Sequence, residues 1–362
     1  MFRYQWLAVV VVCVVTASVG LGQDWPSVPV IEHSTYQAVN SDGTSAYSGT
    51  FPIRLIGVVL NNTEDWLDAT PGYTPAYTPY AMGGQAEFYA QAVNLDGTAW
   101  DPAPGSTFGD FGGTACWIGQ NYGNLPFKGD PIFSYTDAQW TAELGRLNLW
   151  GGDGVTDPIR AGDLVEIRAR AGLNYAGKMN VNEQHDNDYD REDNWDGLGS
   201  DGDGHNHDYE IVVLAPGYGL PAATGLRLSD LKEADDSFIF DSTRNSGGER
   251  YQCSLVELLD VWVSSPAIWS ADGDITVTDG LRTFNVHLGL TGFDGTELFG
   301  VGEPFNVTGI LDQASSSGVY GTDGYQLLAL DPGGFSPVPE PTCLALLLLG
   351  GSMLLSRRRR RQ

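Results

Sequence analysis

The sequence predicts an all-β protein built from two tandem β domains. Two observations support this prediction. Short β-prone runs are separated by tight-turn dipeptides, among them the Asp-Gly pairs that begin at residues 42, 272 and 323, and this is the pattern of strands joined by turns. The chain also repeats itself, because residues 209–217 and 325–333 both read as a strand that ends in Pro-Gly. Long amphipathic helices are few.

A second pair of matching segments lies upstream of the first pair. Residues 162–169 and 302–309 both place a turn of glycine and an acidic residue before an alternating strand. Each half also opens with a β-rich run, at 51–60 in the first and 251–263 in the second. Each half therefore has the order strand, middle hairpin, turn, strand, variable loop and closing strand.

This order resembles the OB fold, a five-stranded Greek-key barrel. In the second half we expect the five strands at 254–263, 274–278, 283–288, 304–311 and 325–330. The resemblance implies two OB-fold-like barrels, and a pair of β-sandwiches is the alternative. The predicted boundaries are a first barrel at 23–214 with insertions at 61–160 and 183–208, a linker at 215–236, and a second barrel at 237–334.

The N-terminal end has the features of a signal peptide, which we place at residues 1–22. Arg3 supplies a positive charge, residues 7–15 form an unbroken apolar run, and Gly20-Leu21-Gly22 offers a small-residue cleavage site. Charge, apolar run and small residues in this order mark a secretory signal. The sequence therefore predicts export.

The C-terminal end, residues 335–362, has three parts in a fixed order. Pro339, Glu340 and Pro341 come first, and a leucine-rich run at 342–356 follows. The chain then ends in a cluster of five arginines: Arg357, Arg358, Arg359, Arg360 and Arg361. Arginines that follow an apolar helix place that end on the cytoplasmic side of a membrane, so we expect the body of the protein to lie outside.

These three parts resemble the PEP-CTERM sorting signal. The resemblance is confined to the C-terminal end, and it implies an exosortase-type processing enzyme as partner. It also implies that the C-terminal helix anchors the chain in a membrane, at least transiently, before delivery to the cell envelope or to extracellular polysaccharide. It says how the protein is sorted, and leaves the role of the body open.

The composition of the body limits its partners. The whole chain has a net charge of −27, and residues 24–338, without Arg3 and the terminal arginines, reach −32. So acidic a body repels phosphate backbones and anionic membranes, which argues against a nucleic-acid partner. Cys116 and Cys253 are the only cysteines of the body, and they form either a disulfide bond or two buried thiols.

The segment 183–208 is the candidate metal site, because it concentrates aspartates and histidines. Oxygen ligands at alternating positions suit Ca²⁺, and the candidate ligands are Asp196, Asp201, Asp203 and Asp208. The glutamate that closes an EF-hand loop is missing. Three interpretations stay open: a solvated acidic loop that joins two strands, a Ca²⁺ site, and a transition-metal site that uses the histidines.

The sequence contains none of the G-x-S-x-G, HExxH or P-loop motifs, so we predict a non-enzymatic protein with catalytic residues absent. Our main hypothesis is an exported surface- or exopolysaccharide-associated binding or structural protein, since OB barrels also bind oligosaccharides. A nucleic-acid-binding OB protein is one alternative, because aromatic residues such as Trp117 could stack bases. A metal-dependent hydrolase that uses the acidic segment is the other. His287 is expected to be an ordinary sheet residue.

Overall fold

The computed structural model describes residues 25–68, 84–93, 110–119, 144–145, 147, 149, 158–182, 209–316 and 321–338. The predicted signal peptide, the predicted sorting motif and the acidic segment lie outside these ranges. Their candidate residues, from Asp196 to Asp208 and from Pro339 to Arg361, therefore stay predictions. Within the described ranges strands dominate and form two sheets, which confirms the all-β class. No helix in these ranges is long and apolar enough to span a membrane.

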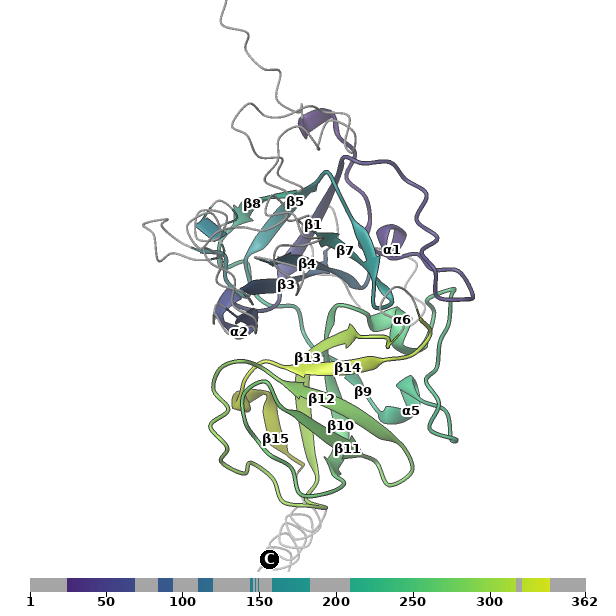
Figure 1. The fold of residues 1–362 in the computed structure, drawn as a ribbon, viewed down its shortest axis with the longest axis vertical. Helices are drawn as coiled ribbons and strands as arrows, with labels where there is room; N and C mark the ends of the chain where they lie inside the picture. Colours follow the sequence, from purple (N-terminus) through teal and green to yellow (C-terminus); the bar gives the residue numbers. More distant parts are fainter. Residues whose placement is uncertain are drawn as a thin grey trace, which may run out of the picture.

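The second domain is a closed five-stranded barrel (Figure 1). Its strands are β10 (Ser254–Val263), β11 (Asp274–Thr278), β12 (Thr283–Leu288), β13 (Phe305–Gln313) and β14 (Tyr325–Ala329). β10, β11 and β12 form an antiparallel meander, and β14 pairs in parallel with β12 and antiparallel with β13. β13 then pairs with β10, and a β-bulge between Leu258 and Val261 bends β10 there. The barrel is therefore OB-fold-like, and its strands lie close to the predicted ones.

Two further strands extend this sheet, and three short helices pack against its strands. They are β9 (Thr224–Leu226), α5 (Leu228–Leu231), α6 (Gly247–Tyr251), η4 (Pro332–Gly334) and β15 (Phe335–Pro337). β9 runs parallel to β10, and β15 pairs with β13. Part of the predicted linker 215–236 and the first residues of the predicted tail thus belong to this sheet.

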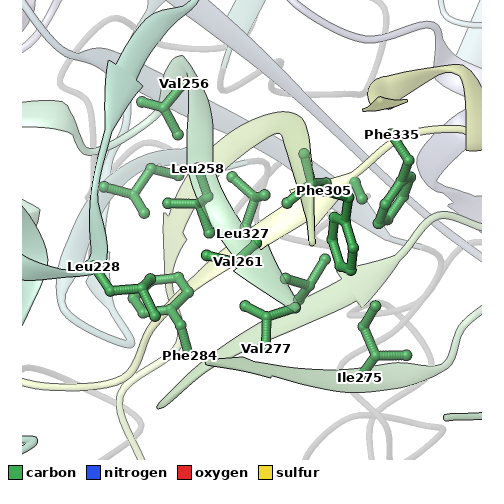
Figure 2. Packing of buried hydrophobic residues seen from close by; sticks show 14 of the residues in the cluster. Leu228, Val256, Leu258, Val261, Ile275, Val277, Phe284, Phe305, Leu327 and Phe335 are labelled. Atoms are coloured by element: carbon green, nitrogen blue, oxygen red, sulfur yellow. The ribbon is translucent and has the colours of Figure 1, made fainter. Parts of the chain in front are cut away.

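Alternating apolar side chains fill the barrel. Figure 2 shows Val261, Val277, Phe305 and Leu327 turned into a common interior, and all four are buried. The ring of Trp269 packs edge-on against Phe335, with 5.2 Å between centroids. Each such side chain contributes about 1.5–3 kcal/mol when it leaves water, so the barrel has a core of its own.

The first domain is built on an eight-stranded sheet. Its strands are β1 (Ile53–Val59), β2 (Leu67–Asp68), β3 (Gln85–Ala92), β4 (Gly113–Gly119), β5 (Leu164–Ala169), β6 (Leu173–Tyr175), β7 (Lys178–Asn182) and β8 (Tyr209–Ala215). Its short helices are η1 (Trp25–Ser27), α1 (His33–Tyr36) and α2 (Thr63–Trp66). The strand order is β6-β7-β4-β3-β1-β5-β8, and β2 pairs with β3.

The first sheet repeats the strand pairs of the barrel up to its last step. β1 pairs with β3 and β5 as β10 pairs with β11 and β13, and β5 pairs with β8 as β13 pairs with β14. The parallel partner of β4, however, is β7. Within the described residues no pairing joins β8 to β4, so the sheet stays open there. β3 and β4, inside the predicted insertion 61–160, are the middle hairpin of this sheet.

The two domains pack against each other through a buried apolar cluster. Its members are Leu60, Tyr89, Ala115, Cys253, Leu255, Ile310 and Leu328. Backbone groups add to the contact, since Gly113 N donates to Gln252 O at 3.0 Å and Leu255 N donates to Gln91 Oε1 at 2.8 Å. Cys116 and Cys253 are both buried free thiols, so the disulfide bond is not formed.

Candidate functional site

A cleft lined by aromatic and polar side chains lies between the two domains. It consists of two adjoining cavities of about 240 and 480 Å³. Both are lined by Gln85, Glu87 and Trp117 of the first sheet and by Gln326 of the barrel. Because these four side chains are common to both cavities, the two form one continuous site, which we call the interdomain cleft.

One face of the first sheet forms the first wall of the cleft. Side chains alternate along its strands, and Phe88, Cys116 and Val181 point into the hydrophobic core. Their neighbours in sequence point the other way, and the strand register places Glu87 beside Trp117 and Trp117 beside Asn182. The wall is therefore a polar sheet face that carries one large indole.

The outer surface of the barrel forms the second wall. Asn285, Gln326 and Asp312 lie side by side on β12, β14 and β13. Asn285 Nδ2 donates to Gln326 Oε1 at 3.2 Å, and Gln326 Nε2 lies 3.5 Å from Asp312 Oδ2. These hydrogen bonds fix the side chain of Gln326, which lines both cavities, between Asn285 and Asp312.

His287 of β12 and Trp66 of α2 close one end of the cleft. Their rings stack with 5.4 Å between centroids and 24° between planes. His287 Nδ1 donates to Asp274 Oδ1 at 3.0 Å, and Nε2 lies 3.5 Å from Asp272 Oδ1. Burial by itself would raise the pKa of Asp274, but hydrogen bonds from Asn285 and His287 outweigh burial and lower it. Asp274 is thus an ionised acceptor that orients the imidazole.

A buried lysine lies at the other end of the cleft. Lys178 Nζ is 2.5 Å from Asp312 Oδ1 and 3.8 Å from Glu87 Oε1, and it donates to Gln313 O at 3.2 Å. Burial alone would lower the pKa of Lys178, but the carboxylates of Asp312 and Glu87 outweigh it and raise the pKa. Burial raises the pKa of Glu87, and Asp312 adds to this while Lys178 opposes it.

The cleft combines flat apolar surfaces with groups that both donate and accept hydrogen bonds. Trp66 and Trp117 contribute indole rings to the lining, and Gln85, Asn180 and Gln326 contribute amides. Part of this capacity is used within the protein, since Trp66 stacks on His287 and Asn285 donates to Gln326 Oε1. A concave site with a few placed polar groups is the usual form of a small-ligand site. Such a mixture suits a ligand that has an apolar face and a rim of hydroxyl groups.

The sequence identified little of this cleft. Its residues come from segments far apart in the chain, and no spacing rule connects Trp66, Trp117 and His287. From the sequence, Trp117 is one of several aromatic residues that could stack bases, and His287 is predicted to be a sheet residue. The structure places His287 in β12. The available signal was the polar residue at every second position of buried strands, as in Lys178–Asn182.

The candidate calcium ligands Asp196, Asp201, Asp203 and Asp208 lie outside the described residues. Among the residues that are described, no group of three or more His, Cys, Asp or Glu could hold a metal ion. The Ca²⁺ site in the acidic segment therefore stays a prediction.

The fold places the chain in the class of all-β proteins that contain an OB-fold-like barrel. No protein-family model matches the chain, and no curated protein matches its sequence. One fold hosts many functions, so the residues of the cleft, and not the fold, indicate what the protein binds.

Proposed function

We propose that this chain is an exported, non-enzymatic binding protein whose interdomain cleft holds a segment of extracellular polysaccharide. The observation that supports this most is the composition of the cleft, in which Trp66 and Trp117 lie among the amides of Gln85, Asn180 and Gln326. A sugar ring has an apolar face of C–H groups and an edge of hydroxyls. Indole faces suit the former, and amides suit the latter, since they both donate and accept hydrogen bonds.

The position of the cleft on the barrel supports the same proposal. OB folds bind oligosaccharides and oligonucleotides on the face of their second and third strands. β11 and β12 are these strands here. β12 supplies His287 to the lining, while Asp274 of β11 and Asn285 of β12 hydrogen-bond to the lining side chains of His287 and Gln326. The analogy is one of fold, and the lining residues are what distinguish a sugar from a nucleotide ligand.

The charges of the cleft favour a sugar over a nucleic acid. Lys178 is the one lysine or arginine among the described lining residues, and it is already paired with Asp312. The lining also contains the carboxyl groups of Glu87 and Asp272. Single-strand binders need a basic groove, and this groove is acidic.

The two chain ends fit such a role. The predicted signal peptide would export the chain, and the predicted PEP-CTERM tail would hand it to an exosortase and hold it at the membrane until then. Delivery to the envelope or to extracellular polysaccharide would place the cleft next to its proposed ligand.

A binding experiment with the Trp117→Ala variant tests the proposal. The purified chain is screened on an array of bacterial glycans and on single-stranded DNA, and the best ligand is measured by calorimetry. Loss of the indole is expected to weaken glycan binding about tenfold or more, since central aromatic residues dominate such sites. The control is Tyr218→Ala, which removes an aromatic residue that does not line the cleft and is expected to bind like the unaltered chain.

Two results would contradict the proposal. One is glycan binding that Trp117→Ala leaves unchanged, because the cleft would then not be the site. The other is retention of single-stranded DNA, weakened by salt, with no glycan retained, which would favour the nucleic-acid alternative.

The acidic segment 183–208 joins β7, which lines the cleft, to β8. We propose that Asp196, Asp201, Asp203 and Asp208 bind Ca²⁺ and so stiffen this connection. A thermal melt in Ca²⁺ should show a Tm that rises with the Ca²⁺ concentration, because a ligand of the native state stabilises it by mass action. Excess chelator should reverse the rise. An unchanged Tm would identify the segment as a solvated loop.

A further inference from the structure

Three side chains from both domains meet at the lysine end of the cleft. Lys178 of β7 and Glu87 of β3 belong to the first domain, and Asp312 of β13 belongs to the second. The side chains of Lys178 and Asp312 are only 7% and 5% exposed. The amine and the carboxylate are thus in contact, away from bulk water, with a second carboxyl group beside them.

The use of lysine here is unusual for this chain. The full sequence has three lysines, Lys128, Lys178 and Lys232, among 19 basic residues. The other ion pairs on the described strands of the first sheet use arginines, as where Arg54 and Arg168 both pair with Glu166. Arginine forms the better bidentate pair with a carboxylate, whereas a lysine amine becomes a nucleophile once its proton has left. Because the carboxylates of Asp312 and Glu87 raise the pKa of Lys178, the proton has to pass to the paired carboxylate and not to water.

The two charges of the pair lie away from bulk water. Taking two charges out of water costs several kcal/mol per ion before the attraction between them is counted. The ring of Tyr89 lies 5.9 Å from Lys178 Nζ and shields it. An amide bond between the two side chains would remove both buried charges and expel one water.

We propose that Lys178 and Asp312 join in an intramolecular isopeptide bond, which links the first domain covalently to the second. The bond forms between Nζ and the carboxyl carbon of Asp312, and one carbon–oxygen bond of that carboxyl group breaks. An ammonium and a carboxylate become an amide and one water, so that charge and atoms balance and nothing is oxidised or reduced.

The neighbouring groups can perform the proton transfers of this step. The proton of the ammonium passes to Asp312 along the 2.5 Å contact, and the neutral amine then attacks. Glu87, whose Oε1 lies 3.8 Å from Lys178 Nζ, donates a proton to the leaving hydroxyl after it has itself been protonated, and takes one from the nitrogen, so it ends as it began. Burial raises its pKa and so makes the protonated form easier to reach. Gln326 Nε2, 3.5 Å from Asp312 Oδ2, faces the oxygen on which negative charge develops. The fold supplies the proximity that makes such a condensation fast.

This inference does not depend on the proposed sugar ligand. A cross-link between β7 and β13 fixes the two walls of the cleft relative to each other. It also closes a long loop of chain, which restricts the unfolded state in the way that a disulfide bond does. The two thiols of the described residues, Cys116 and Cys253, make no such bond.

Intact mass under denaturing conditions tests the proposal. The full purified chain is expected to be lighter by one water than its sequence requires, and proteolysis should release one branched peptide that joins Lys178 to Asp312. Lys178→Arg keeps the charge and should restore the sequence mass. The matched control is Lys232→Arg, which alters a lysine that pairs with Asp236 within the second domain and should leave the loss of one water intact.

A second variant distinguishes loss of the condensation reaction from loss of the folded state. Glu87→Gln keeps the shape of the side chain, and its fold is checked by circular dichroism; it should accumulate chain at the full sequence mass. Complete linkage in this variant would overturn the role given to Glu87. An unaltered chain at its full sequence mass, or a loss of water that persists in Lys178→Arg, would overturn the isopeptide bond itself.

Discussion

The two sheets are built by the same sequence of pairings and differ at the last one. In the second domain β14 alone closes the barrel, because it pairs with both β12 and β13. In the first domain two different strands make the corresponding pairings: β7 pairs with β4, and β8 pairs with β5. The segment 183–208 lies between β7 and β8, so the division coincides with the insertion.

This difference locates the cleft. A separate β7 continues the first sheet past β4 and presents Lys178, Asn180 and Asn182 on its polar face. The barrel supplies the opposite wall with strands that are already fully paired. The cleft therefore forms at β7, the strand by which the first sheet differs from the barrel. The closed barrel provides the opposite wall.

The largest effect that we expect concerns Gly309 in β13, whose counterpart in the repeat is Ala169 in β5. A Cβ at Gly309 would lie 2.4 Å from the carbonyl oxygen of Leu328, and backbone cannot move aside cheaply. Gly309→Ala should therefore lower the free energy of unfolding by about 3 kcal/mol, the upper part of the range for overpacking. Denaturant titration followed by fluorescence measures this.

The open sheet provides the control for this variant. Ala169 is buried and already has the methyl group that the barrel excludes. Ala169→Gly should lower the free energy of unfolding by only about 0.5–1 kcal/mol, through the added freedom of the backbone. Equal costs at both positions would contradict the view that only the second domain is tightly closed.

A smaller effect is expected at the contact between the domains. Leu255 of β10 is buried in the shared apolar cluster, so Leu255→Ala should lower the free energy of unfolding by about 2 kcal/mol. Because both domains bury surface there, the two should unfold together, and the variant should shift one transition without splitting it. Differential scanning calorimetry measures this, with the exposed Leu281→Ala as control. Two separate transitions in the unaltered chain would mean that the domains are energetically independent.

The second domain could be predicted from the sequence almost strand by strand. Alternation and turn residues are local signals, and they placed three strands at 254–263, 274–278 and 283–288, where the structure has them. In the first domain the repeat located β5 and β8, but β3 and β4 were taken into the insertion 61–160. Long stretches of chain separate these strands from their partners, so the order of the repeat cannot be followed there by spacing alone.

The cleft could not be predicted in the same way. Trp66, Glu87 and His287 are brought together by the packing of two domains, and packing has no local signature in a sequence. The acidic segment 183–208 predicts a metal site because its aspartates lie close together in the sequence. It lies outside the described residues. Residues adjacent in sequence suggest metal sites, whereas Lys178 and Asp312, 134 positions apart, needed the fold to show that they meet.

The smallest effect concerns the segment that precedes each sheet. In the first domain this segment is held by backbone and by one buried carboxylate, since Ile31 N donates to Arg54 O at 2.7 Å and Ser34 N donates to Asp110 Oδ1 at 2.8 Å. In the second it is held by side chains, since Asp236 contacts Lys232 Nζ at 2.7 Å and accepts hydrogen bonds from Thr283 N and Oγ1. The second attachment contains an ion pair at the surface, and its carboxylate is the one that a pH experiment can test.

Burial by itself would raise the pKa of Asp236, but the hydrogen bonds from Lys232 and Thr283 lower it to about 2. A carboxyl group with a lowered pKa stabilises the folded state above its ordinary pKa of 3.8, and this contribution disappears as the pH falls through about 2. Asp236 is 38% exposed, so water and salt screen the pair, and Asp236→Asn should cost about 1 kcal/mol or less at neutral pH. Melts from pH 7 to pH 2 should show the variant and the unaltered chain converging as the pH falls. A difference that stays constant over this range would mean that the hydrogen bonds to Thr283, and not the charge of Asp236, hold this segment.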